Sequence, residues 1–189
     1  MGYLNLTSHI DGDTKLVATI TDAEGHHMLV TAPLLEHLIE DGEVFVATDF
    51  LADLADAANR DYLIVTGDTE GLHLGMSFTV GADTTARIFR DTTHTGGAAL
   101  TEFNRNQNDA DGCGNIALTQ GPGGGADGDQ IFATIIPGGS KVNSSPGGGR
   151  GWAFGWLLES NTSYLVRLTN ISGAATPVST QFDLHLHEV

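Results

Sequence analysis

The chain has 189 residues, which is enough for one domain with a hydrophobic core and an additional arm. Its formal net charge is −16 with only eight lysines and arginines, so the composition disfavours binding to nucleic acids or anionic lipids, whose phosphates attract basic side chains. The sequence has no apolar run of about 18 residues, so we expect no membrane-spanning helix. It begins without the basic and apolar segments of a secretory signal, so we expect no such signal.

The composition favours short strands and turns over helices. Glycine is abundant, with 25 residues, and threonine and aspartate are frequent. Cys113 is the only cysteine, which excludes an intramolecular disulfide. It lies in a glycine-containing loop whose acidic neighbours would raise the pKa of a thiol, so we predict that Cys113 is unreactive.

The first forty residues combine strand and helix signals. Residues 15–21 and 26–31 are rich in β-favouring side chains, and the intervening turn residues are of hairpin type, which predicts two paired strands. Residues 34–39 follow a proline and place leucines at helical spacing, which predicts a short helix.

The mixed pattern continues to residue 61. Residues 44–48 predict a short strand, and residues 50–58 place apolar side chains on one helical face, which predicts a second helix. Together these elements predict a small α+β arm that spans residues 1–61. Its apolar side chains exceed what a piece of this size can bury, so we expect them to contact a neighbouring molecule. The expected contact residues are Leu34, Leu35, Leu38, Phe50, Leu51 and Leu54.

From Tyr62 to the end of the chain the pattern is almost purely β. Apolar and polar residues alternate over 72–80 and again over 178–186, as in strands with one buried face. Roughly eight strands at this spacing predict a jelly roll or β-sandwich for residues 62–189. The expected strands are 62–65, 72–80, 86–89, 99–103, 116–119, 130–136, 152–158, 163–169 and 178–186.

Two long glycine-rich loops interrupt this domain, at residues 121–129 and 137–151. Long loops in a compact domain are commonly functional or mobile. We interpret them either as contacts with a neighbouring subunit or host surface, or as flexible excursions.

The best metal-ligand candidates are His185 and His187, which share one face of the last strand. A third ligand would have to come from His73 or His94. The alternative interpretation is a solvent-facing polar strand end, so we predict no bound metal and no cofactor. The aspartates of 109–112 and 124–129 lack the spacing of known calcium loops and read as ordinary turns.

The sequence offers no pattern typical of an enzyme. A nucleophile elbow, a phosphate-binding loop and a dinucleotide-binding glycine fingerprint are all missing from the predicted strand ends. Carboxylates are plentiful, but in an acidic protein that is weak support for an acid–base pair. We therefore predict that the protein is not an enzyme.

Two stretches carry a resemblance to a known family. Residues 95–108 read TGGAALTEFNRNQN and contain Gly-x-x-Leu-x-x-x-Asn-x-Asn. Residues 156–173 read WLLESNTSYLVRLTNISG and contain Trp-x-Leu-x-x-Asn-Thr-x-Tyr-Leu-x-Arg-Leu-Thr-Asn. Both elements resemble those of tailed-bacteriophage virion proteins that include jelly-roll head cement proteins. Glu159 stands where this family frequently has lysine. From the residues themselves, we expect Asn104, Asn106 and Asn108 to stabilise a tight turn through side-chain-to-backbone bonds, and Arg167 to point outward and pair with a carboxylate.

This resemblance implies a capsid decoration (cement) protein on the outer surface of the virion. Its partners would be the major capsid protein, whose neighbouring subunits it would clamp together, and further copies of itself. It would form a homo-oligomer, commonly a trimer. The arm residues Leu34 to Leu54 named above would then make the capsid or subunit contacts. Two alternatives remain open: a tail or receptor-binding module of similar fold, and a cupin-like metal protein.

Overall fold

The computed structural model describes residues 7–11, 15–21, 27–33, 38–68, 72–109, 112–114, 116–138 and 151–186. Most of this part of the chain is strand, and its one helical turn lies at residues 38–40. The strands are β1 (Thr7–Asp11), β2 (Lys15–Thr21), β3 (His27–Pro33), β4 (Val44–Leu54), β5 (Asn59–Thr66), β6 (Leu72–Val80), β7 (Thr84–Arg90), β8 (Ala98–Ala99), β9 (Glu102–Asn104), β10 (Ile116–Gln120), β11 (Asp129–Ile136), β12 (Gly151–Leu158), β13 (Ser163–Asn170) and β14 (Thr176–Leu186).

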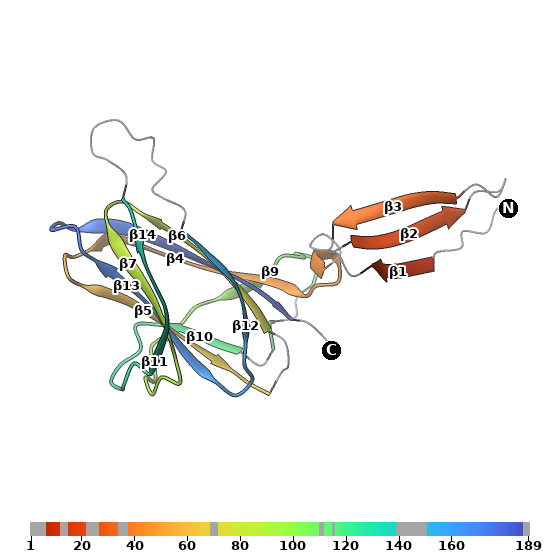
Figure 1. Cartoon of the computed structure of the whole chain (residues 1–189). Helices are drawn as coiled ribbons and strands as arrows, with labels where there is room; N and C mark the ends of the chain where they lie inside the picture. Colours follow the sequence, from red (N-terminus) through yellow and green to blue (C-terminus); the bar gives the residue numbers. More distant parts are fainter. Residues whose placement is uncertain are drawn as a thin grey trace.

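The strands form a small sheet and a two-sheet sandwich (Figure 1). The small sheet has the order β1-β2-β3, and the two sheets of the sandwich have the orders β11-β7-β13-β5-β10-β8 and β12-β6-β14-β4-β9. Every pairing within them is antiparallel.

The sandwich is a jelly roll, and its pairing shows why. Strands β4, β5, β6 and β7 pair respectively with β14, β13, β12 and β11. The chain therefore runs as one long hairpin whose two arms are wound together into two facing sheets, which is the jelly-roll connection. The predicted fold class of the main domain is confirmed.

Strands β8, β9 and β10 are an insertion between β7 and β11. β10 extends the six-stranded sheet beyond β5, and β9 extends the five-stranded sheet beyond β4. The insertion therefore adds strands to both sheets on the same side of the sandwich, next to the first two strands of the roll.

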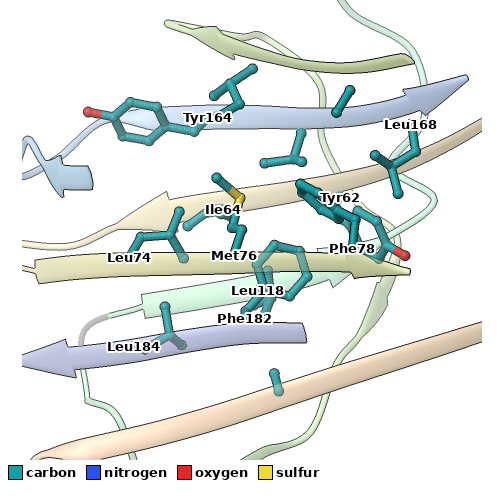
Figure 2. Close-up of a cluster of buried hydrophobic side chains, with 14 of the residues drawn as sticks. Tyr62, Ile64, Leu74, Met76, Phe78, Leu118, Tyr164, Leu168, Phe182 and Leu184 are labelled. Atoms are coloured by element: carbon teal, nitrogen blue, oxygen red, sulfur yellow. The ribbon is translucent and has the colours of Figure 1, made fainter. Parts of the chain in front are cut away.

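The core fills the space between the two sheets. Along β6 every second side chain is buried, and the same alternation on the neighbouring β14 buries Phe182 and Leu184. Facing them from the other sheet are Ile64 and Leu168 (Figure 2). Alternation with period two thus sends one face of each strand into a shared apolar layer.

One polar group, the hydroxyl of Tyr62 on β5, forms hydrogen bonds across this apolar layer. The hydroxyl lies 2.9 Å from Asp49 Oδ2 on β4 and 2.9 Å from Thr180 Oγ1 on β14, so it bonds the opposite sheet at two points. Arg60 donates to the same Asp49 oxygen at 2.6 and 2.8 Å. Burial raises the pKa of Tyr62 to about 12, which keeps the hydroxyl protonated as a donor.

The helix predicted at residues 50–58 is wrong, because this stretch continues the eleven-residue strand β4. Val178 on β14 pairs with Leu51 and Thr176 pairs with Leu54, so β4 carries one extra residue there, a β-bulge. The bulge lets two apolar residues three positions apart both reach the core. Leu51 and Leu54 therefore have the three-residue spacing that is also typical of one face of a helix.

The boundary predicted after residue 61 is also wrong. β4 lies between β14 and β9, and β5 lies between β13 and β10, so residues 44–61 belong to the sandwich. The arm is therefore the β1-β2-β3 sheet. Its two predicted strands, 15–21 and 26–31, are confirmed as β2 and β3, whereas β1 has no counterpart in the sequence prediction.

Candidate functional site

The register of the arm sheet divides its residues into two sets of positions, one of mixed polarity in sequence and one almost entirely apolar. Directly paired residues lie on the same face of a sheet, and successive residues alternate between faces. One face carries Thr7, His9, Asp11, Lys15, Val17, Thr19, Thr21, His27, Leu29, Thr31 and Pro33. The other carries Ser8, Ile10, Leu16, Ala18, Ile20, Met28, Val30 and Ala32, and Ser8 is its only polar residue.

The arm extends from one end of the sandwich, and neither large sheet lies over it in Figure 1. Its strands contact one another, and among the described strands they have no extensive contacts with the sandwich. Small sheets of two or three strands depend on a packed apolar face for stability. The arm is therefore a small sheet whose apolar residue types lie at one set of register positions and which has no extensive contacts with the described strands of the sandwich.

The root of the arm is held by asparagines of the turn that follows β9. Asn104 Nδ2 donates to the carbonyl of Gly42 at 2.9 Å, and Asn106 Nδ2 donates to the carbonyl of Glu40 at 2.9 Å. Arg105 N adds a bond to the carbonyl of Val44 at 2.8 Å. We call these three contacts the root clamp.

The clamp residues also stabilise their own turn. Asn106 N donates to Asn104 Oδ1 at 2.8 Å, and Asn108 N donates to Asn106 Oδ1 at 3.1 Å. The predicted role of these asparagines in side-chain-to-backbone bonding is thus confirmed for Asn104 and Asn106. Gly42 has a φ of +78°, a left-handed conformation that favours glycine at this point of the root.

The outer face of the five-stranded sheet near this root presents a row of paired side chains. Leu157, His73, His185 and Val44 lie opposite one another across β12, β6, β14 and β4. The imidazole rings of His73 and His185 stack with their centroids 4.4 Å apart and 6° between their planes. Leu157 is 63% exposed, and so the row is partly apolar at the surface.

The metal-ligand candidates are therefore placed only in part. The structure places His185 beside His73, which was one of the two candidates for a third ligand. His187 lies outside the described residues. His94 lies against Asp127, on a loop that follows β7. Among the described residues no group of three potential metal ligands is present.

The predicted contact residues have different environments. Leu34 and Leu35 lie outside the described residues, and Leu38 is half-buried in the helical turn at the arm root. Phe50 is 67% exposed on the outer face of β4, and Leu51 packs against the core. Leu54 is fully inside the core, so its predicted role as a contact residue is wrong.

On the outer face of the six-stranded sheet, Arg167 joins two loops to the strands. Its guanidinium bonds both oxygens of Asp61 at 2.9 Å and both oxygens of Asp127 at 2.5 and 3.0 Å. The predicted pairing of Arg167 with a carboxylate is confirmed. His94 Nε2 lies 2.9 Å from Asp127 Oδ1. Arg167 first and His94 second hold the pKa of Asp127 below its ordinary value.

The first glycine-rich loop, 121–129, is bound to the loop that follows β7. Ala126 N donates to Thr93 Oγ1 at 2.8 Å, and Thr93 N donates to the Ala126 carbonyl at 3.0 Å. A Cβ on Gly125 would collide with the Thr93 and His94 backbone. This loop is therefore packed on its own domain, contrary to a flexible excursion. Most of the second loop, 137–151, lies outside the described residues.

Cys113 is buried in the core, with 1% of its surface exposed. Burial, and to a lesser extent Glu102, raises the pKa of its thiol to about 12. Almost no thiolate forms near neutral pH, which is the physical basis for the predicted low reactivity.

The sequence indicated which of these residues form contacts, but it did not indicate which partners they bind. Asn104 and Asn106 stood out as turn formers, but the carbonyls they bind lie 62 and 66 residues earlier. Arg167 stood out as a basic residue on an outward face, but nothing in the pattern linked it to Asp61 or Asp127.

Comparison with known proteins gives little more. No family model matches the chain, and no curated protein matches it significantly. A crystal structure of the Yersinia pseudotuberculosis-derived mitogen aligns with 76% of this chain and 87% of its own, with 13% identity and a TM-score of 0.30. That likeness is too weak to support a conclusion about fold or function. In the described part of the chain, no helix is long and apolar enough to cross a membrane.

Proposed function

We propose that this chain is a structural protein of a tailed-virus particle, a capsid decoration (cement) protein that binds between major capsid subunits on the outer surface of the head. In this role the protein binds and does not catalyse a reaction. The observation that carries the proposal is the separate three-stranded arm, whose register gathers apolar residue types at one set of positions outside the jelly roll.

The root clamp gives a second line of support. The asparagines that form it belong to the Gly-x-x-Leu-x-x-x-Asn-x-Asn element, one of the two on which the resemblance to phage head cement proteins depends. In this chain that element holds the carbonyls of Glu40 and Gly42, in the segment that leads into β4. Order in this segment before binding lowers the entropy lost when the arm binds.

The energetics of such an attachment follow from apolar burial. Each square ångström of apolar surface removed from water stabilises a contact by about 25 cal/mol. Repeated over many copies on a capsid lattice, a contact of modest strength cross-links neighbouring subunits. In this arrangement the arm makes the contact, and the sandwich is the rigid domain that carries the arm.

Two single substitutions on β3 test the arm. Val30→Asp puts a carboxylate at one of the apolar register positions, whereas Thr31→Asp puts the same charge at a position of the mixed set on the same strand. We expect Val30→Asp to lower binding to heads purified without the protein by at least about tenfold, and Thr31→Asp to change it little. Binding is measured by cosedimentation with the heads, and thermal unfolding of each variant verifies that the sandwich is intact.

Electron microscopy of virions carrying the labelled protein separates head decoration from a role in the tail. Label at many regular positions on the head agrees with the proposal. Label confined to the tail, or equal head binding by Val30→Asp and the unmodified protein, contradicts it.

A further inference from the structure

The two sheets of the sandwich end on the same side in long edge strands. β11 terminates the six-stranded sheet and β12 terminates the five-stranded sheet. Phe132 on β11 and Trp156 on β12 meet edge to face with their ring centroids 6.0 Å apart, so the two edges lie close together. Each strand has eight residues and pairs with one neighbour among the described strands.

The opposite side of the sandwich ends differently. There the outermost strands are β8, with two residues, and β9, with three. Very short edge strands are a common way to prevent sheets from pairing with another chain, because they expose few free N–H and C=O groups. The insertion between β7 and β11 supplies this protection on one side only.

The long edges are apolar and nearly uncharged. Ile131 and Ile135 on β11 are 39% and 62% exposed, and Leu157 on β12 is 63% exposed. Of the sixteen residues in the two strands, Asp129 alone carries a charge. Exposed edge strands commonly carry lysine or another charged residue that opposes pairing, and these two strands have no lysine or arginine.

We propose that copies of this chain associate with one another along the outer edges of β11 and β12. An edge strand is complementary to a second copy of itself, because its free donors and acceptors match when the two run antiparallel. β11 is regular from Phe132 to Ile136, beyond its single bulge, and this stretch is long enough to pair. A second copy brings both of its edges at once, so both sheets continue across the contact.

The net charge restricts where two copies can contact each other. Two molecules that each carry a formal charge of −16 repel, so they can approach closely only where carboxylates are scarce. The β11 and β12 edges are such a place, since one charged residue lies in sixteen. Antiparallel pairing of an edge with its own copy is a two-fold contact, so this edge predicts a dimer, and a mass measurement counts the copies.

Lysine substitutions at the edge test the proposal without any capsid. Ile135→Lys and Leu157→Lys each put a charge on one of the two edges. Val65→Lys is the matched control, because it replaces an apolar residue that is 36% exposed on the inner strand β5 with the same charge. Analytical ultracentrifugation gives the mass of each full-length variant, and thermal unfolding verifies that it is folded.

We expect the unmodified protein and Val65→Lys to sediment as oligomers, and both edge variants to dissociate at concentrations at least about tenfold higher. A monomeric unmodified protein at every concentration overturns the proposal. So does an oligomer whose mass is unchanged in both edge variants, because association would then use another surface. Since no capsid is present, either result leaves the test of the arm unaffected.

Discussion

Single charged side chains decide how the loops are held on the six-stranded sheet. Arg167 is bonded by carboxylates from β5 and from the 121–129 loop, so a positive charge lies at the centre of an acidic surface. Its guanidinium also lies 5.7 Å from the centroid of the Phe89 ring. The outward-facing Leu63 and Leu165 of the same sheet are buried. The ion pairs thus help to hold polar loops over an apolar part of the sheet.

Acid should weaken this arrangement through Asp127. Its folded-state pKa is lowered by Arg167 and His94, so the ionised carboxylate contributes stability above its ordinary pKa, and that contribution is lost as the pH falls through the folded-state value. We expect Asp127→Asn to lower the melting temperature at about pH 6 and to differ less from the unmodified protein at about pH 3. An equal difference at both pH values would contradict this role.

At the scale of elements, the arm and the sandwich are connected through a short root. Gly42 N donates to the Ile39 carbonyl at 3.1 Å and Glu43 N donates to the Leu38 carbonyl at 3.0 Å, which closes a compact turn. The root clamp then fastens this turn to the segment after β9. The position of residues 40–42 therefore depends on side-chain amides of a segment that is remote in sequence.

Asn106→Ala tests the clamp with little disturbance of the core, because Asn106 is half-buried and does not belong to the core. The variant loses the bond to the Glu40 carbonyl and the bond from Asn108 N. We expect a loss of about 1–2 kcal/mol, and hence hydrogen exchange at the amides of Gly42 and Glu43 that is faster by roughly fivefold or more. Asn108→Ala, which preserves the Asn106 bond to Glu40, is the control. Unchanged exchange in Asn106→Ala would show that the root is held by other contacts.

The glycines of the 121–129 loop illustrate how an element and its surroundings are fitted together. A Cβ on Gly128, whose φ is +88°, would collide with the Arg90 carbonyl. This loop is glycine-rich because it passes close to the backbone that follows β7. A glycine-rich composition by itself is equally compatible with a mobile loop, which is why the sequence left both interpretations open.

For the whole molecule, Cys113 reports on cooperative unfolding. Its thiol is buried and its pKa is raised to about 12, so labelling by a thiol reagent near pH 8 requires the protein to open. We expect labelling in the native state to be slow and to increase with denaturant together with the loss of β-sheet circular dichroism. Rapid labelling without denaturant would show that the region opens independently of the sandwich.

The sequence by itself determined the strand character of most of the chain. Alternation over 72–80 and 178–186 indicated buried faces that the structure confirms, because the period of two is a local property of a strand. The asparagines of residues 104–106 and the outward position of Arg167 were recognised on the same local grounds. The jelly roll followed from the number and spacing of such strands.

Only the tertiary structure decided what those strands and side chains contact. A bulge in β4 made two inward residues look like a helical face, and it was the pairing with β14 that fixed this stretch as a strand. The boundary of the arm, the partners of the root clamp and the position of β11 and β12 as open edges all depend on contacts between residues far apart in the chain. Local patterns specify which face of an element is apolar, but long-range packing selects the neighbour that covers it.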